Sequence, residues 1–90
     1  MRSVDIAKVY SAPHCKACEL AKAYLQEKGV SYVEVDVADD AKACEVLLKM
    51  TGRLTIPVVE FAGRFVIGFS RRRLDELLEE RGVTGEIAES

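Results

Sequence analysis

Residues 6–28 read IAKVYSAPHCKACELAKAYLQEK, an apolar run followed by a breaker, two cysteines and a long amphipathic segment. The run at residues 6–10 carries one charge, Lys8, and ends at Ser-Ala-Pro, which predicts a short buried strand. Apolar residues then recur three and four positions apart over residues 15–28, with charged residues in most other positions, and Gly29 follows. This spacing predicts an amphipathic helix that ends at the glycine.

Residues 30–37 alternate between polar and valine side chains, which predicts a strand with one face in the core. Asp39 or Asp40 can cap the helix that follows, and we expect this helix to end at Gly52. Its apolar stripe consists of Cys44, Leu47, Leu48 and Thr51. Because a free cysteine behaves as a small hydrophobe, Cys44 is expected to stay reduced in the core.

Two β-rich segments, residues 58–62 and 64–67, lie on either side of Gly63. A short apolar segment, a glycine and a second apolar segment favour an antiparallel hairpin. Ser70 can cap a final helix that carries its leucines on one face, and Gly82 ends that helix. The chain is therefore predicted to close with a hairpin and a helix.

The predicted elements follow the order β-α-β-α-β-β-α, with no repeat, linker or low-complexity segment between them. The opening strand, helix and strand require a right-handed crossover between parallel strands, whereas the closing hairpin is antiparallel. We therefore predict an α/β protein with a mixed four-stranded sheet flanked by helices. It forms a single domain over residues 1–90, of which residues 83–90 are expected to be a flexible tail.

The composition argues against several classes of protein. The chain has 90 residues, of which 49% are apolar and 31% charged, and a formal net charge of -2. This length suits one small globular domain, and the charge argues against nucleic-acid binding, which relies on a basic surface. No stretch approaches the ~20 apolar residues of a membrane span, and the N-terminus lacks the apolar run of a secretory signal. We expect a cytoplasmic monomer that binds neither membranes nor nucleic acid.

The chain has three cysteines, an odd number that cannot all pair with one another. Cys15 and Cys18 stand at the start of the first predicted helix, where unpaired N–H groups and the helix dipole favour a thiolate. Only the thiolate is a competent nucleophile. The spacing puts Cys18 on the same helix face, one turn deeper. The pattern predicts that Cys15 attacks a disulfide and that Cys18 resolves the mixed disulfide.

A metal site is the main alternative for this cysteine pair. The chain has no second Cys-x-x-Cys pair, and only His14 and Cys44 could complete a set of four ligands. A structural disulfide is disfavoured because so short a loop restrains little of the unfolded chain. Disulfide exchange is the favoured interpretation, with no metal site and no tightly bound cofactor. Binding of zinc or an iron–sulfur cluster by Cys15, with or without Cys18, across a dimer stays open as a second hypothesis.

Three segments of the chain carry a family resemblance. They are residues 9–18 (VYSAPHCKAC), residues 51–59 (TGRLTIPVV) and residues 68–70 (GFS). In this order they resemble the glutaredoxin family of the thioredoxin fold, and the resemblance extends over about residues 6–81. It implies a glutaredoxin-like thiol–disulfide oxidoreductase in which Cys15 is the nucleophile, Cys18 is the resolving cysteine and a cis peptide bond precedes Pro57.

The resemblance also implies residues that contact the substrate. The carbonyl and N–H of Ile56 would be free to pair with the backbone of a bound thiol peptide, since Pro57 opens a strand and withholds an N–H from the sheet. Arg53 could hold a glutathione carboxylate with two hydrogen bonds, and a protonated His14 could favour the thiolate of Cys15. The full set of expected contacts is His14, Arg53, Thr55, Ile56, Pro57, Gly68, Phe69 and Ser70.

The motifs leave two electron donors open. Glutathione-using members of the family usually carry a lysine at the position of Ala12, and Gly-Gly-x-Asp-Asp where this chain has Gly68-Phe69-Ser70 followed by three arginines. Gly-Phe at this place resembles the ribonucleotide-reductase-associated redoxins, which thioredoxin reductase reduces. Residues 51–53 and 55–57 resemble ordinary glutaredoxins instead. The donor is therefore glutathione or thioredoxin reductase, and the substrate a disulfide-containing protein or a glutathione mixed disulfide. In the alternative that the redoxin-like motif implies, thioredoxin reductase reduces the protein, which then donates electrons to a reductase such as ribonucleotide reductase.

Arg71, Arg72 and Arg73 fall in the first turn of the last predicted helix. Positive charge there opposes the helix dipole, at a cost of roughly 0.3 kcal/mol or more for each residue. The arginines either contact an anion or an acidic partner beside the active site, or form a solvated cluster balanced by helical pairing with acidic residues. The acidic residues in question are Asp75, Glu76, Glu79 and Glu80.

Overall fold

Five strands form one mixed sheet in the computed structural model, which describes residues 6–79 and 85–86. They are β1 (Ala7–Ser11), β2 (Tyr32–Asp36), β3 (Val58–Phe61), β4 (Arg64–Ile67) and β5 (Gly85–Glu86). Their order across the sheet is β2-β1-β3-β4-β5. β1 runs parallel to β2 and antiparallel to β3, and β3 and β4 form the predicted antiparallel hairpin.

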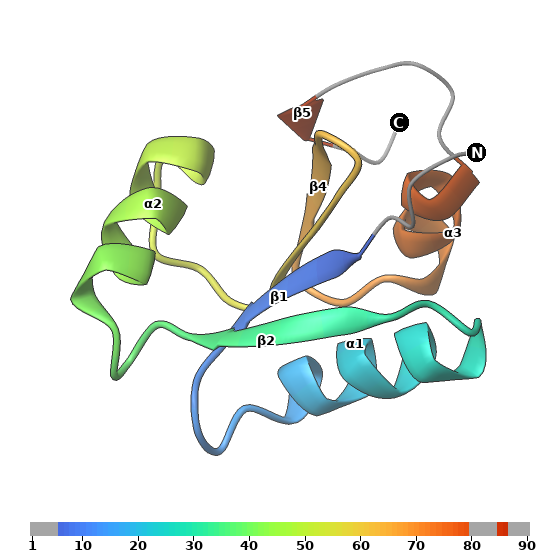
Figure 1. Cartoon of the computed structure of the whole chain (residues 1–90), viewed down its shortest axis with the longest axis horizontal. Helices are drawn as coiled ribbons and strands as arrows, with labels where there is room; N and C mark the ends of the chain where they lie inside the picture. Colours follow the sequence, from blue (N-terminus) through green and yellow to red (C-terminus); the bar gives the residue numbers. More distant parts are fainter. Residues whose placement is uncertain (1–5, 80–84, 87–90) are drawn as a thin grey trace.

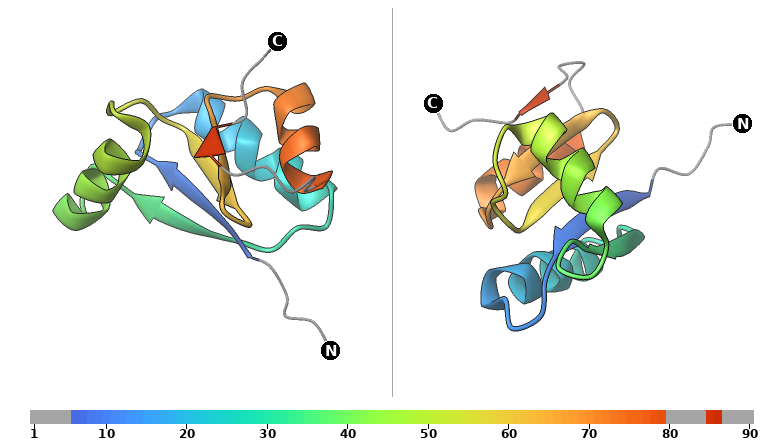
Figure 2. Two further views of the ribbon diagram at one scale, coloured as in Figure 1. Left: turned by 90° about the horizontal axis from the view of Figure 1, so that it is seen from above. Right: turned by 90° about the vertical axis from the view of Figure 1, so that its left-hand side faces the viewer.

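Three helices lie within the described residues. They are α1 (Lys16–Glu27), α2 (Ala41–Thr51) and α3 (Arg71–Glu79). α1 and α3 cover one face of the sheet and α2 covers the other, so the sheet is the middle of three layers (Figures 1 and 2). This arrangement confirms the predicted β-α-β-α-β-β-α order and the mixed sheet flanked by helices. None of these helices has the length and apolar character needed to cross a membrane.

The sheet divides the core into two clusters. On the α1 and α3 face, ten buried residues form one cluster, which includes Leu25, Leu74 and Leu77. On the α2 face, five buried residues form the other, and Leu47 is its only contribution from α2. Because apolar burial is the main favourable term in folding, the larger cluster fixes α1 firmly on the sheet.

The boundaries of α2 follow from local sequence signals. The Asp40 carboxylate accepts hydrogen bonds from the N–H groups of Lys42 and Ala43, at 3.0 and 3.2 Å, so Asp40 rather than Asp39 caps the helix. Gly52 ends α2 with a φ of 83°, in the left-handed region that glycine adopts without a Cβ clash. The predicted start and end of this helix are both confirmed.

β2 is less regularly buried than its alternating sequence predicts. The prediction that Val33, Val35 and Val37 form the core-facing side of this strand is wrong for Val33, which is 48% exposed. Val35 and Val37 pack against the α2-side cluster, whereas Tyr32 packs against the cluster on the opposite face. The physical reason is that β2 is an edge strand, and the helices cover each of its faces only in part.

The apolar stripe of α2 is also displaced from its predicted position. Ala43 and Leu47 are the buried residues of this helix, and Met50 packs beside them. Leu48 is 46% exposed, and Cys44 is a free cysteine that is half-buried rather than buried in the core. Spacings of four and three from Ala43 to Leu47 to Met50 keep one row against the sheet, and Cys44 lies on the flank of that row.

β5 adds a short fifth strand that the sequence does not predict. Gly85 and Glu86 pair in parallel with Arg64 and Phe65 of β4. The rest of the expected tail over residues 83–90, and the predicted end of the last helix at Gly82, lie outside the described residues.

Candidate active site

The cysteine pair lies where β1 leads into α1. β1 ends at Ser11, and a short loop reaches Cys15, whose extended backbone and side chain cap the helix. Within this loop His14 adopts a φ of 61°, a left-handed conformation that is uncommon outside glycine. The loop turns the chain from the sheet onto the helix that covers it.

Cys15 and Cys18 are joined by a disulfide, and their Cα atoms are 5.2 Å apart. The backbone N–H of Cys18 donates to the Sγ atom of Cys15 over 3.1 Å. Cys18 is only 1% exposed, whereas Cys15 is half-buried. The structure thus brings the two predicted cysteines together and gives them different access to solvent.

This position favours a thiolate at Cys15 once the disulfide is reduced. A sulfur at the N-cap faces the unpaired N–H groups of the first turn and lies at the positive end of the helix dipole. The Cys18 N–H is already directed at this sulfur, so the thiolate gains a charge-assisted hydrogen bond with no change in the backbone. The geometry suits Cys15 to nucleophilic attack, and it suits the buried Cys18 to attack on a sulfur already bonded to Cys15.

An open hollow surrounds the accessible side of Cys15, and its other lining residues are His14, Lys16 and Glu19. Lys16 brings a positive charge to the rim and Glu19 brings a negative one, so a substrate meets both signs beside the sulfur. His14 lines this hollow beside Cys15, and its predicted role toward the thiolate and the substrate stays a prediction.

The sheet brings the other two motifs to the same place. The pairing of β1 with β3, and of β3 with β4, places Pro57 beside the end of β1 at Ser11 and Gly68 beside Pro57. The Ile56–Pro57 peptide bond is cis, as predicted. The Gly68 N–H donates to the Pro57 carbonyl over 2.7 Å. Three segments that are far apart in the sequence therefore meet at one end of the sheet.

The loop before Pro57 presents two of the expected substrate contacts to solvent. Arg53 and Thr55 are exposed. The Thr51 hydroxyl fixes the loop, because it donates to the Arg53 carbonyl over 2.7 Å and accepts the Arg53 N–H at 3.2 Å. Ile56 is half-buried, and its side chain packs against the α2-side cluster. Its predicted contact with substrate therefore rests on its backbone groups.

Phe69 and Ser70 lead from this site into α3. The Phe69 ring packs edge-to-face on Tyr24 of α1, with the ring centroids 6.3 Å apart. The Ser70 hydroxyl oxygen accepts the Arg73 N–H over 3.3 Å and so caps α3. Phe69 thereby packs the start of α3 against α1, and Ser70 caps α3 itself. Contact of either residue with substrate stays a prediction.

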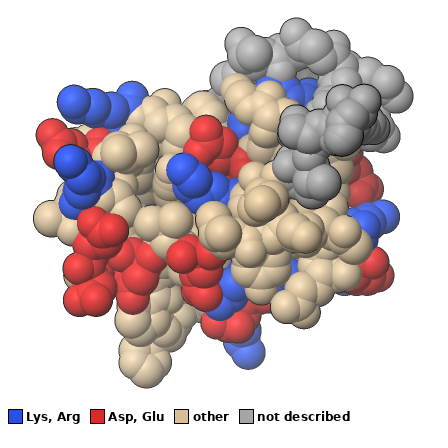
Figure 3. Space-filling model, viewed as in Figure 1, with Lys and Arg blue, Asp and Glu red and all other residues tan. Residues whose placement is uncertain are grey.

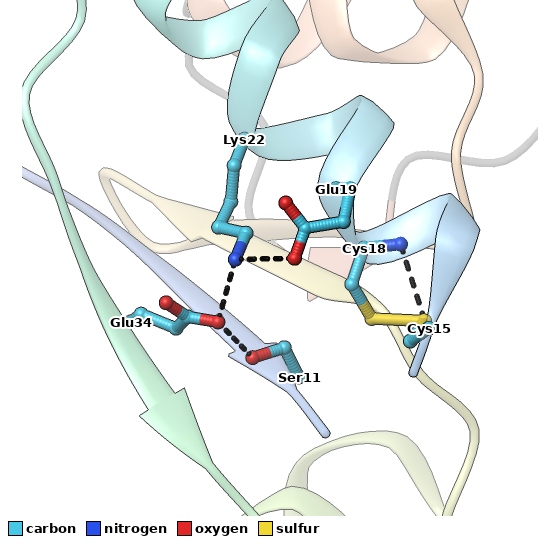
Figure 4. Close-up of a disulfide and its surroundings, with 6 residues drawn as sticks. All are labelled: Ser11, Cys15, Cys18, Glu19, Lys22 and Glu34. Carbon is cyan, nitrogen blue, oxygen red and sulfur yellow. Dashed lines mark hydrogen bonds and ion pairs between the residues drawn. A yellow bond between two sulfur atoms is a disulfide. The ribbon is translucent and has the colours of Figure 1, made fainter. Parts of the chain in front are cut away.

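Four polar side chains beside the disulfide form a network that the sequence does not predict (Figure 4). One carboxylate oxygen of Glu34 accepts from the Ser11 hydroxyl over 2.7 Å and from the Lys22 ammonium over 2.8 Å. Lys22 also pairs with Glu19, at 3.0 Å. The network ties the first two turns of α1, which contain Cys18 and follow Cys15, to β1 and β2.

The network favours the charged forms of Glu34 and Lys22. The hydrogen bond from Lys22, and then that from Ser11, lower the pKa of Glu34. The hydrogen bonds to Glu34 and then to Glu19 raise the pKa of Lys22. Ser11 is 1% exposed, and a buried hydroxyl requires a partner. Ser11 ends a strand that the sequence predicts to be buried, so the need of its hydroxyl for a hydrogen-bond partner could have indicated the network.

A metal site built within one chain, with His14 and Cys44 completing the ligands, gains no support from the side-chain placement; the hypothesis of a site shared across a dimer is not tested by it. Within residues 6–79 and 85–86, no group of three or more His, Cys, Asp and Glu side chains is placed to hold a metal ion. His14 precedes α1 and Cys44 lies on α2, on the opposite face of the sheet (Figure 1). The structure therefore does not bring these two candidate ligands together.

Comparison with known proteins agrees with this geometry. The glutaredoxin family model matches residues 7–66. An uncharacterized glutaredoxin-like 8.6 kDa protein in the rubredoxin operon of Clostridium pasteurianum is 36% identical, over 81% of this chain and 97% of that protein. The chain belongs to the glutaredoxin family. Glutaredoxin 3 of Escherichia coli strain K12 is also 36% identical, over 58% of this chain and 63% of that protein.

The fold of this glutaredoxin-family protein is found in solved structures. The crystal structure of a glutaredoxin from Archaeoglobus fulgidus superposes with a TM-score of 0.76, over 82% of this chain and 86% of that one, at 22% identity. The predicted thioredoxin-like fold is thereby confirmed.

Proposed function

We propose that this protein is an enzyme, a thiol–disulfide oxidoreductase that reduces protein disulfides or glutathione mixed disulfides. The observation that carries the proposal is the asymmetric cysteine pair at the start of α1. Cys15 is accessible and caps the helix through a hydrogen bond from the Cys18 N–H, while Cys18 is buried directly behind it. Membership of the glutaredoxin family supports the same chemistry.

The proposed reaction consists of two thiol–disulfide exchanges. The Cys15 thiolate attacks one sulfur of the substrate disulfide; a bond forms between these sulfurs, and the other substrate sulfur leaves as a thiolate that takes a proton from solvent. Cys18 then loses its proton and attacks the Sγ atom of Cys15, which releases the remaining substrate sulfur. Two electrons pass to the substrate, and the enzyme is left with the Cys15–Cys18 disulfide.

The electron donor is either glutathione or thioredoxin reductase. Arg53 is exposed on the loop before Pro57, where its guanidinium could pair with a glutathione carboxylate. Gly68 and Phe69, followed by arginines rather than aspartates, favour thioredoxin reductase instead. With either donor, the cycle requires a reducing compartment such as the cytoplasm.

Trapping the mixed disulfide tests the assigned roles. A Cys18→Ser variant should accumulate a covalent adduct on Cys15 when it reacts with a disulfide substrate, because nothing resolves the intermediate. Mass mapping of peptides locates the adduct. The matched control is a Cys18→Ser/Cys44→Ser double variant, which should retain the adduct. A Cys15→Ser variant should form none, although its serine hydroxyl can still cap α1. An adduct on Cys44, or full turnover by Cys15→Ser, would contradict the proposal.

Parallel coupled assays distinguish the donors. In one, glutathione and glutathione reductase supply electrons, and in the other thioredoxin reductase supplies them directly. Turnover with thioredoxin reductase alone would exclude glutathione as the donor, and an Arg53→Gln variant should slow only the glutathione-coupled assay.

A further inference from the structure

The charges of α3 run against the preference of its helix dipole. Its first turn carries Arg71, Arg72 and Arg73 and no acidic residue, and its last turn carries no basic residue. Over the face seen in Figure 3, by contrast, basic and acidic side chains are interspersed. Each first-turn cation costs α3 roughly 0.3 kcal/mol or more, so the stability of this helix does not account for the arginines.

The acidic residue one turn from Arg71 is engaged elsewhere. Asp75 accepts a hydrogen bond from the Tyr24 hydroxyl and lies 3.8 Å from the Lys28 ammonium. The Arg71 guanidinium lies instead over the Tyr24 ring, 5.8 Å from its centroid. Among the described residues, neither Arg71 nor Arg73 forms an ion pair, and the buried Nε of Arg73 has no hydrogen-bond partner. Ion pairs with acidic residues of the same helix therefore do not balance the charges of Arg71 and Arg73 among the described residues.

The arginines lie beside the proposed active site but beyond the reach of the reacting sulfurs. Gly68, hydrogen-bonded to Pro57, precedes them by three residues. Tyr24, under Arg71, is nine residues along α1 from Cys15, about 13 Å at the helical rise. A standard interface buries roughly 800 Å² on each partner, equivalent to a round patch of about 16 Å radius. The span from Cys15 to Tyr24 along α1 is therefore shorter than the radius of such a patch.

We propose that Arg71 and Arg73 dock an acidic segment of the disulfide-bearing protein substrate while Cys15 attacks its disulfide. The inference rests on the proposed function and specifies the partner. Guanidinium groups offer only hydrogen-bond donors, which match carboxylates, and the unpaired N–H groups of the first turn of α3 add to the attraction. Such a surface accelerates encounter and selects acidic partners, and added salt weakens its effect.

The test uses three disulfide-linked peptides that differ only in a segment flanking the disulfide, which is acidic, neutral or basic. The wild-type protein should show a kcat/KM about tenfold higher for the acidic peptide than for the neutral one at low ionic strength, and high salt should abolish the difference. The basic peptide should be the slowest. The ratio between peptides is the readout because it does not depend on the fraction of folded protein.

Two double variants locate the effect. Arg71→Gln/Arg73→Gln should lose the preference for the acidic peptide, while Arg71→Lys/Arg73→Lys, which keeps the charge, should retain most of it. The matched control is Lys42→Gln/Lys49→Gln, which removes the same charge from α2 on the other face of the sheet, and it should keep the full preference.

Equal kcat/KM for acidic and neutral peptides in the wild-type protein would overturn the docking surface, as would an equal loss in the α2 control. If the wild-type protein reduces none of the peptides, including the neutral one, the proposed oxidoreductase function itself fails. The two failures are therefore distinguishable.

Discussion

Cys15 serves at once as the cap of α1 and as the proposed nucleophile. Helix N-caps are usually serine, threonine, aspartate or asparagine, whose side-chain oxygens accept a first-turn N–H. Here the Sγ atom of Cys15 accepts that hydrogen bond, from Cys18. The same bond satisfies an unpaired amide of the helix and favours negative charge on the sulfur. The hydrogen bond that caps α1 therefore also prepares Cys15 for its proposed role as nucleophile.

Glu34 holds the helix start in a way that depends on pH. Its pKa is lowered in the folded protein from an ordinary value of 4.5. A carboxyl with a lowered folded pKa stabilises the fold above the unfolded pKa, and the contribution is lost as the pH falls through the folded pKa. Lys22 behaves in the opposite sense, because its pKa is raised above 10.5. Its contribution is full below that value and is lost as the pH rises through the raised pKa.

We expect Glu34→Gln to lower the free energy of unfolding by up to about 1 kcal/mol at neutral pH, a modest value because the carboxylate is half exposed. The difference from the wild-type protein should shrink as the pH falls below 4.5 toward the lowered pKa of Glu34. Urea unfolding at a series of pH values measures it. Glu27→Gln removes an exposed charge at the far end of α1 and should cost little at any pH. A difference that persists undiminished in acid would rule out this role for the Glu34 charge.

At the scale of the elements, the type and order of helices and strands could be predicted from the sequence. Which side of β2 and of α2 is buried could not. Periodicity, caps and glycines are local signals, so α1, α2 and the β3–β4 hairpin agree with the prediction. Burial depends on which neighbours cover a face. Val33 is exposed because β2 is an edge strand, and Cys44 is only half-buried because α2 packs through the row of Ala43 and Leu47.

The two candidate caps of α2 provide a matched pair of variants. Asp40→Ala should lower the free energy of unfolding by about 1 kcal/mol, because it removes the acceptor of two first-turn N–H groups. Asp39→Ala should change it by less than about 0.5 kcal/mol, as is usual for an exposed surface substitution. Urea denaturation of both variants compares them directly. Equal losses would show that the cap at Asp40 contributes nothing specific.

At the scale of the whole molecule, sheet register assembles the site from segments that the sequence keeps apart. Cys15, Pro57 and Gly68 could be predicted because each stands in a short recognisable motif. Their meeting then follows from the pairing of β1, β3 and β4. The Glu34 network and the engagement of Asp75 by Tyr24 could not be predicted, because each joins side chains from different elements through space.

Arg64 also joins two elements that are separate in the sequence, because its side chain links β4 to α3. Its side chain is 3% exposed, and its guanidinium donates to the carbonyls of Glu76 and Leu77 at 2.8 and 2.5 Å. These carbonyls belong to the last turn of α3, where a helix has no internal donors. Arg64 therefore supplies, from the sheet, the positive charge that the end of α3 itself lacks.

We expect Arg64→Met, which keeps an unbranched apolar stem, to lower the free energy of unfolding by about 1–3 kcal/mol, because a buried and a partly buried carbonyl lose their donor. Arg64→Lys should lose less, since an ammonium can still reach one carbonyl. Lys49→Met, at an exposed position on α2, should have a small effect and controls for the loss of charge. Urea denaturation measures all three, and hydrogen exchange of α3 amides should show faster opening in Arg64→Met alone. If Arg64→Met is as stable as the wild-type protein and its α3 amides exchange no faster, then Arg64 does not hold this helix on the sheet.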